Sequence, residues 1–390
     1  METRGSFASL CVAYNKYGDD KITDNMNIPQ MEAWFGEEEA QAVSLYLKGN
    51  LKGRPWNAEF EKAVGDVTGA SFAVSSLNGT ISLTQALLAL SLQPGDEVLV
   101  PNSTMIATPN SCSIIGLKPI LIDIEEETLC LDLVQAEKAV TPRTKAMMYV
   151  PLNGRSGNMD DVVAFCKKHN LFLIEDAAQA LGSYYKGKHF FKRHLGTFGD
   201  IGSFSFSLFK IISTTQGAAL VTNNQLWYEK IKLLKDFGRT GKGPDIHDHF
   251  GFNFKMSGIL ALIGVEQFKK LPWRMKRKKE MYTRIKEGLA ALPQVEFIKT
   301  DVSVTTPWFM DIFVDDPKAL ATHLKKAGID TRFFYPPIHT QEIYKKDYSG
   351  RSFPVSEYYA ARGLWLPSSS QLTDEEIDYI IKAIEAFYRA

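Results

Sequence analysis

The sequence has no excess of either charge, because its 45 lysine and arginine residues equal its 45 aspartate and glutamate residues. Proteins that bind nucleic acid over an extended surface carry a basic excess, so this balance argues against that class. The chain has only four cysteines, none in a CxxC pair: Cys11, Cys112, Cys130 and Cys166. They indicate neither a disulfide framework nor a zinc site, and we expect no bound metal.

Long apolar runs are also missing. No segment approaches the ~20 apolar residues that a membrane span needs. The first 26 residues contain one brief apolar patch and no clear cleavage site. We therefore expect a cytoplasmic protein that acts on a small molecule and does not enter a membrane.

The order of apolar segments predicts the fold class. Strands are predicted at Glu97–Val100, Ile120–Ile124, Ala146–Leu152, Leu171–Ile174, Ser203–Phe206 and Ala219–Thr222, with helices at Thr80–Leu90, Asp132–Ala139 and Met159–His169. Alternation of this kind is typical of an α/β protein whose mostly parallel sheet carries helices on both faces. At 390 residues the chain is long enough to bury a large core in two lobes.

The domain boundary is predicted at a proline. Residues 257–271 have apolar residues at helical spacing, and Pro272 is expected to end that helix. We therefore expect a polar extension over 1–26, a large domain over 27–271 and a small α+β domain over 272–390. The small domain should contain strands at Val295–Ile298, Trp308–Val314 and Thr331–Tyr335, a helix from Asp316 to Gly328, and a capping box between Thr373 and Glu376.

One lysine follows a strand in an unusual setting. Lys210 comes after the alternating run Ser203–Ser207 and before the turn formers that end at Gly217. A partly desolvated lysine loses its proton more readily and can form a Schiff base. A plain surface lysine at a strand end is the alternative.

An acid follows the buried strand that comes before the Lys210 strand in the chain. Asp176 comes directly after the apolar run Leu171–Ile174, and ligands bind outside the carboxyl ends of strands in an open α/β sheet. Pyridoxal phosphate requires such a pair, a lysine for its aldehyde and an acid that keeps its ring nitrogen protonated. An aspartate that caps a helix is the alternative for Asp176.

A third segment offers a phosphate cradle. The polar turn Ser75–Thr80 leads into an apolar helix, whose first N–H groups and positive dipole end favour a phosphate. Asn78-Gly79 is also common in plain turns, so this signal depends on the other two.

Taken together, seven segments resemble the DegT/StrS family of nucleotide-sugar aminotransferases, which have the fold-type I architecture of pyridoxal-phosphate enzymes. The motifs are SSLNGTISL from Ser75, PNSTMIATPN from Pro101, LIEDAAQALG from Leu173, GTFGDIGSFSFSLFK from Gly196, GFNFKMSGILALIGVEQ from Gly251, FFYPPIH from Phe333 and LWLPSSSQLTDEEID from Leu364. The resemblance covers about residues 27 to 390, and the ordered set is more specific than any one motif. The last two motifs favour the perosamine synthetase-like subgroup, which aminates C4 of nucleotide-linked 4-keto-6-deoxy sugars for polysaccharides such as the O-antigen of lipopolysaccharide.

The resemblance implies a role for each matching residue. Lys210 and Asp176 match the catalytic lysine and the acid at the ring nitrogen, and L-glutamate is the implied amino donor. The implied cofactor-binding set is Gly79, Thr80, Ile81, Met105, Asp176, Gln179, Ser205, Lys210 and Asn253. Asn253 matches an asparagine that reaches the phosphate from the neighbouring subunit, which implies a homodimer with shared active sites. Tyr335 and His339 fall in a loop near the substrate, although a purely structural His339 is equally compatible.

The chain also departs from the family pattern. The family's GEGG is replaced by Thr215–Ala218, Met105 stands where an aromatic residue often stacks on the cofactor, and a His-x-Tyr-Gly segment is replaced by Pro151–Gly154. These changes leave the Schiff-base chemistry intact and bear on the substrate.

Three other hypotheses are weighed against the aminotransferase. A sugar dehydratase of this family has a histidine in place of the lysine, so Lys210 counts against it. A non-catalytic regulatory protein would not need the Lys210 and Asp176 pair. A metal site at His247 and His249 lacks further histidine or cysteine partners.

Overall fold

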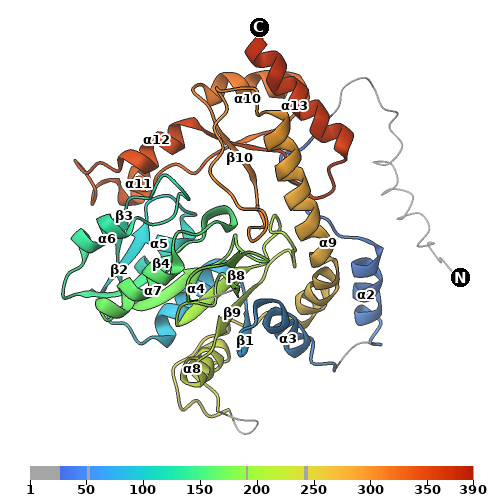
Figure 1. Ribbon diagram of the computed structural model, residues 1–390. Coiled ribbons are helices and arrows are strands. Elements are labelled where there is room, and N and C mark those ends of the chain that lie inside the picture. Colours follow the sequence, from blue (N-terminus) through green and yellow to red (C-terminus); the bar gives the residue numbers. More distant parts are fainter. Residues whose placement is uncertain (1–26, 51–52, 190–191, 241–244, 390) are drawn as a thin grey trace, which may run out of the picture.

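The computed structural model describes residues 27–50, 53–189, 192–240 and 245–389. The extension predicted for residues 1–26 lies outside these ranges. Within them, a central sheet and a smaller C-terminal sheet are surrounded by helices (Figure 1). The predicted α/β class is confirmed by this arrangement.

The central sheet has seven strands in the order β1-β9-β8-β5-β4-β2-β3. They are β1 (Phe72–Ser76), β2 (Glu97–Pro101), β3 (Lys118–Ile122), β4 (Thr144–Tyr149), β5 (Phe172–Asp176), β8 (Ile201–Ser205) and β9 (Ala218–Thr222). β2, β3, β4, β5 and β8 pair in parallel, whereas β9 runs antiparallel to both of its neighbours, β1 and β8. The sequence pattern does not predict β1, because its second half, Ser75-Ser76, has the composition of a turn.

The strand register places the ends of three strands at one edge of the sheet. Asp176, the last residue of β5, pairs with Ser203 of β8. At the end of β8, Ser205 pairs with Ala218 of β9, which also pairs with Ser76 of β1. The ends of β5, β8 and β1 therefore lie at the same edge of the sheet.

Helices cover both faces of this sheet. They are α3 (Trp56–Thr68), α4 (Gly79–Ala89), α5 (Ala107–Ser113), α6 (Leu133–Ala139), α7 (Met159–Lys168) and α8 (Gln225–Lys235). The helix α2 (Glu37–Leu47) instead packs on α9 (Gly258–Gly288). Neighbouring strand residues alternate between two cores: Met147 packs with α3, α6 and α7, and Met148 packs with α4, α5 and α8. This alternation is the two-residue period of a strand that is buried on both faces. Short elements on the same part of the chain are η2 (Leu152–Gly154) and the hairpin β6 (Tyr184–Tyr185) with β7 (Arg193–His194).

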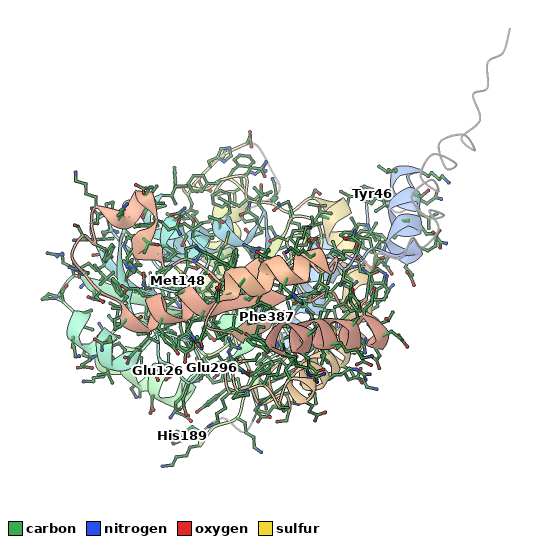
Figure 2. All side chains as sticks on the ribbon, turned by 90° about the horizontal axis from the view of Figure 1, so that it is seen from above. Tyr46, Glu126, Met148, His189, Glu296 and Phe387 are labelled. Atoms are coloured by element: carbon green, nitrogen blue, oxygen red, sulfur yellow. The ribbon has the colours of Figure 1, made fainter. Side chains whose placement is uncertain are left out.

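The C-terminal region builds a second layer. An antiparallel sheet in the order β10-β12-β11 contains β10 (Met310–Phe313), β11 (Arg332–Phe333) and β12 (Gly363–Leu366). Its helical elements are α10 (Pro317–Lys326), η3 (Ile338–Thr340), α11 (Glu342–Lys345), α12 (Pro354–Arg362) and α13 (Asp374–Arg389). Figure 2, seen from above, shows α10 and α13 over this layer, with Phe387 in α13, and His323 of α10 packs on Phe387 with ring centroids 5.4 Å apart.

Two local predictions for this region have different outcomes. The capping box is confirmed, because the Thr373 N–H donates to the Glu376 carboxylate at 2.8 Å and the Glu376 N–H donates to Thr373 Oγ1 at 3.2 Å. The strand predicted at residues 295–298 is wrong, since only an isolated bridge joins Glu296 to Phe313.

The prediction that Pro272 ends a helix is also wrong. Helix α9 runs without interruption from Gly258 to Gly288 and contains Pro272. A proline inside a helix removes one backbone hydrogen bond and costs ~3 kcal/mol. Packing offsets this cost, because the first half of α9 packs in the core with α3 and the second half packs with α13 (Figure 1). The predicted domain boundary therefore falls inside a continuous helix, and the division into domains stays a prediction.

Residues 304–311, which we call the strap, connect the C-terminal layer to segments that flank the central sheet. Thr306 N–H donates to Ser183 Oγ at 3.0 Å, and the Asn153 amide makes two hydrogen bonds to the backbone of Phe309, at 2.6 and 2.8 Å. At the end of the strap, both guanidinium NH groups of Arg155 donate to the carboxylate of Asp311, at 2.6 and 3.1 Å. The strap is thus hydrogen-bonded to these segments at Thr306, Phe309 and Asp311.

The Arg155–Asp311 pair yields a stability prediction. Both side chains are buried, 2% and 1% exposed, so Asp311→Asn leaves a buried guanidinium without its carboxylate. Loss of one partner of a buried ion pair costs about 3–5 kcal/mol. We expect urea denaturation to show a fall of this size in the free energy of unfolding. The matched control is Asp66→Asn in the exposed Lys62–Asp66 pair, which should change little. An Asp311→Asn protein as stable as this control would contradict the inference that the Arg155–Asp311 pair stabilises the fold.

Candidate active site

A cavity of about 580 Å³ opens at the carboxyl edge of β5 and β8. Of the predicted site residues, those that line it are Gly79, Thr80, Ile81, Met105, Asp176, Gln179, Ser205, Lys210 and Tyr335. They come from segments between residues 79 and 335, so only the fold brings them together. Asn253 and His339 do not line the cavity.

Lys210 extends from the turn after β8 into this cavity, and its side chain is half-buried. Its Nζ lies 3.7 Å from the centre of the Trp308 ring. Burial is the largest influence on its pKa and lowers it to about 8 from the usual 10.5; Asp176 raises this pKa and Arg332 lowers it. Lys210 thus lines a cavity, which favours a functional lysine over a plain surface one, and its catalytic role stays a prediction. A lysine with this pKa supplies a neutral amine near neutral pH, as nucleophilic catalysis requires.

Asp176 lies at the end of β5 with its carboxylate buried. Its Oδ2 accepts a hydrogen bond from Thr108 Oγ1 at 2.7 Å, and its Oδ1 accepts one from the Ala178 N–H at 3.3 Å. Turns rather than a helix follow Asp176, so the alternative of a helix cap is wrong. Burial raises the pKa of Asp176, while Thr108 and Lys210 act in the opposite direction. A buried carboxylate of this kind favours a cationic partner.

The N-terminus of α4 forms another wall of the cavity. Asn78 is the N-cap, and its Oδ1 accepts a hydrogen bond from the Ile81 N–H at 3.0 Å. The N–H groups of Gly79 and Thr80 have no acceptor within the helix and carry the positive end of its dipole. A Cβ at Gly79 would lie 3.3 Å from the Ser205 side chain, so glycine lets the backbone approach that hydroxyl. The Ser205 Oγ shares a hydrogen bond with Ser207 Oγ at 2.6 Å. This cluster of donors fits a phosphate group.

Gln179 occupies a fixed position beside the acid. Its Oε1 accepts a hydrogen bond from the Asn153 N–H at 2.8 Å. Asn153 lies in the segment that departs from the family's His-x-Tyr-Gly pattern, and it has a positive φ of 54°. This segment therefore binds both Gln179 and the strap.

The structure separates His339 from the cavity. The His339 ring lies 2.9 Å from Asn102 Nδ2 and 3.3 Å from the Glu357 carboxylate, and it packs on Phe353 with ring centroids 4.7 Å apart. Burial lowers the pKa of His339. These contacts favour the structural reading of this histidine, and its role as a substrate ligand stays a prediction.

Asn253 also lies outside the cavity of its own chain. Its side chain is exposed, and its backbone forms an isolated bridge with Asp236. The predicted role of Asn253 in a neighbouring subunit's site stays a prediction.

Sequence reasoning missed several residues of the site. Thr108 belongs to the quoted motif PNSTMIATPN, but nothing in the motif shows which hydroxyl reaches Asp176. Arg332, Trp308, Phe309 and Gln216 also line the cavity. Trp308 and Arg332 lie 98 and 122 positions after Lys210 in the chain, and no local pattern connects them.

Other hypotheses were also compared with the structure. His247 Nδ1 lies 2.7 Å from the Phe237 carbonyl oxygen. Within residues 27–50, 53–189, 192–240 and 245–389, no group of three or more His, Cys, Asp or Glu side chains is arranged to hold a metal ion. No helix in these same ranges is long and apolar enough to cross a membrane.

Comparison with known proteins identifies the family. A model of the DegT/DnrJ/EryC1/StrS aminotransferase family matches residues 34–385. The chain belongs to this family. It is 36% identical over 333 residues to GDP-perosamine synthase of Escherichia coli O157:H7, which covers 85% of this chain and 89% of the relative.

Solved structures agree with this membership. DesV of S. venezuelae, solved in complex with a ketimine intermediate, superposes with a TM-score of 0.84 at 29% identity, over 90% of this chain and 95% of that one. The putative sugar aminotransferase Spr1654 of Streptococcus pneumoniae, solved in its PLP form, superposes with a TM-score of 0.85 at 25% identity, over 93% and 99% of the two chains. The predictions of fold class, pyridoxal-phosphate cofactor and sugar aminotransferase activity are confirmed.

The lowered pKa of Lys210 predicts how the protein takes up its cofactor. The neutral amine attacks the aldehyde, so the rate of uptake should rise with pH and level off above about 8. An unperturbed lysine would give a rate still rising at pH 9.5, because its pKa is 10.5. The measurement is the rate of appearance of the visible absorption band when cofactor-free protein is mixed with pyridoxal phosphate at several pH values. Free N-acetyl-lysine methyl amide serves as the control amine.

Proposed function

We propose that this chain transfers the amino group of L-glutamate to the keto carbon of a nucleotide-linked sugar, C4 of a 4-keto-6-deoxyhexose. One observation carries the proposal: Lys210 and Asp176 line the same cavity as Gly79 and Thr80 at the N-terminus of α4. The similarity to GDP-perosamine synthase supports a GDP-linked sugar among the substrates to be tested.

The residues present fit pyridoxal phosphate. The Gly79 and Thr80 N–H groups and the Ser205 hydroxyl would hold the phosphate, and Asp176 would hold the ring nitrogen. Lys210 would carry the aldehyde carbon. When bound, pyridoxal phosphate supplies a conjugated ring that accepts the electron pair left by a departing proton.

The chain itself supplies the proton transfers. The Lys210 amine is a base near neutral pH, because burial lowers its pKa to about 8. It is the group in this cavity suited to take a proton from carbon and return it, as a general acid and base. The Asp176 carboxylate keeps its position through the hydrogen bond from Thr108, at 2.7 Å.

Both proposed substrates carry anionic groups, and Arg332 offers them a guanidinium. It lines the cavity and lies over the Trp365 ring, 5.2 Å from the ring centre. A guanidinium binds carboxylate or phosphate through paired hydrogen bonds. We therefore assign substrate binding to Arg332, with Tyr335 beside it in the wall of the cavity.

We also propose that the active protein is a cytoplasmic homodimer with shared sites. The exposed side chain of Asn253 supports this arrangement, because it is available to a second copy of the chain. A closed two-fold contact is the commonest form of such assemblies.

The dehydratase and the regulatory protein are not favoured. Lys210 is in place in the cavity, and the relatives compared are aminotransferases or GDP-perosamine synthase. Dehydration would leave no nitrogen in the product, so one assay separates these hypotheses.

The first test of the function is a product screen. The protein, pyridoxal phosphate and glutamate are incubated with several nucleotide-linked 4-keto-6-deoxyhexoses, the GDP-linked one included. Mass spectrometry should detect an amino sugar and 2-oxoglutarate, and Lys210→Ala should form neither. A dehydrated product without nitrogen, or turnover by the Lys210→Ala protein, would contradict the proposal.

Borohydride reduction provides the control for the site itself. It should fix the cofactor on the peptide that contains Lys210. Lys278 is the matched comparison, because burial also lowers its pKa but its Nζ donates to the carbonyl oxygens of Trp308 and Ser368. A label on Lys278 would show that the site is wrongly assigned.

The shared site predicts complementation between inactive chains. A mixture of Lys210→Ala and Asn253→Ala chains should recover part of the native activity, because one site of each heterodimer contains both native residues. The measurement is the amination rate after the two chains are mixed, unfolded and refolded together. Each variant refolded alone is the control. A fully active monomer in light scattering would exclude the shared site.

A further inference from the structure

The Lys210 ammonium faces an aromatic ring. Nζ lies 3.7 Å from the centre of the Trp308 ring, well within the ~6 Å range of a cation–π contact. The Trp308 side chain is buried, so water competes little for the ammonium at this face. In the described part of the chain, Nζ has no hydrogen bond, and the indole is its direct neighbour.

The indole is held in place from several directions. Its Nε1–H donates to the Phe209 carbonyl oxygen at 2.8 Å, directly before Lys210 in the chain. The Trp308 carbonyl oxygen accepts a hydrogen bond from Lys278 Nζ at 2.5 Å. The adjacent Phe309 stacks on the indole with ring centroids 3.9 Å apart, and its backbone is bound by Asn153.

These contacts give the ring a fixed position relative to the lysine. Asn153 binds the backbone of Phe309, and Lys278 of α9 binds the backbone of Trp308. The Phe209 hydrogen bond joins the indole to the segment that carries Lys210. The lysine side chain, by contrast, has four rotatable bonds and loses entropy when it is ordered. A fixed ring face can reduce the set of positions that the amine visits.

The charged and titratable groups that face Lys210 are few. Asp176 and Arg332 act on its charge in opposite directions, and the buried phenol of Tyr335 lies in the same cavity. None of them is within hydrogen-bonding distance of Nζ. The Trp308 face is therefore the contact that sets where the free ammonium lies.

We propose that Trp308 is a positioning residue, whose indole face holds the protonated side chain of Lys210 whenever that side chain is not attached to the cofactor. The inference rests on the proposed function, in which Lys210 is attached in one part of the cycle and free in the other. In the free state the amine must stay close enough to move a proton and then to attach again. Trp308 performs this task through Lys210 and does not itself react.

The test compares three variants at position 308. Trp308→Phe keeps an aromatic face, Trp308→Leu replaces it with an apolar side chain, and Trp308→Met is a second non-aromatic variant in case Trp308→Leu fails to fold. Stopped-flow absorbance follows a single turnover after each cofactor-loaded protein is mixed with glutamate. The affinity for pyridoxal phosphate is measured separately by fluorescence titration, and thermal unfolding reports the stability of each variant.

The aromatic face should account for the difference among the variants. Trp308→Phe should stay within about threefold of the native single-turnover rate, and the non-aromatic variants should fall roughly threefold to thirtyfold below it, the range that a cation–π contact supplies. Cofactor affinity should change by less than about threefold in all of them, because the phosphate cradle lies on α4. Equal rates in Trp308→Phe and Trp308→Leu would overturn the proposal, as would a loss that follows cofactor affinity or thermal stability alone.

A pH profile gives a readout that a packing role would not produce. The indole face stabilises the ammonium, so its removal should shift the midpoint of cofactor uptake by the cofactor-free protein to lower pH, by roughly half a unit to one unit. Trp308→Phe should keep the native midpoint. An upward shift in Trp308→Leu would mean that the ring acts by excluding water, and it would overturn the proposal.

The outcomes also separate this inference from the proposed function. Borohydride labelling is carried out on every variant. A label on a lysine other than Lys210 in the native protein would remove the proposed site itself. A label on Lys210 throughout, with no difference between Trp308→Phe and Trp308→Leu, would overturn the role of Trp308 alone.

Discussion

The site depends on the parallel pairing of β5 with β8. This pairing sets Asp176 opposite Ser203, and it therefore places the acid and the turn that carries Lys210 at one edge of the sheet. Asp176 and Lys210 are 34 positions apart in the chain, and the crossover between them includes the hairpin of β6 and β7. A shift of one residue in the register would turn the Asp176 side chain to the other face of the sheet. The placement of Asp176 and Lys210 in one cavity therefore depends on the pairing of these two strands.

The strap and α9 connect the C-terminal layer to that edge. α9 packs with α3 in its first half and with α13 in its second, and Lys278 on α9 binds the Trp308 carbonyl oxygen. The strap in turn carries Trp308 and Phe309 into the wall of the cavity. Because these contacts include the buried Arg155–Asp311 pair, the C-terminal layer acts as a structural part of the active site.

Lys278, which is buried, and Lys210, which is half-buried, show why a perturbed pKa does not by itself identify a catalytic group. Burial lowers the pKa of Lys278 to about 7 and that of Lys210 to about 8. Lys278 Nζ is bound by two carbonyl oxygens and lies outside the cavity, so its role is to join α9 to the strap. Lys210 Nζ lies against the indole face and opens into the cavity. Access and hydrogen bonding, rather than the pKa, distinguish the two.

The sequence by itself determined the features that are local in the chain. Strand ends, the helix that begins at Gly79 and the capping box at Thr373 depend on neighbouring residues, so Lys210, Asp176 and the α4 cradle could be predicted. Tertiary structure alone decided the rest. Pro272 lies inside a helix because packing on both halves of α9 outweighs the lost hydrogen bond, His339 is bound to Asn102 and Glu357 outside the cavity, and Thr108, Trp308 and Arg332 reach the site from distant segments. Those contacts join residues far apart in sequence, and their free energy arises only when the layers pack.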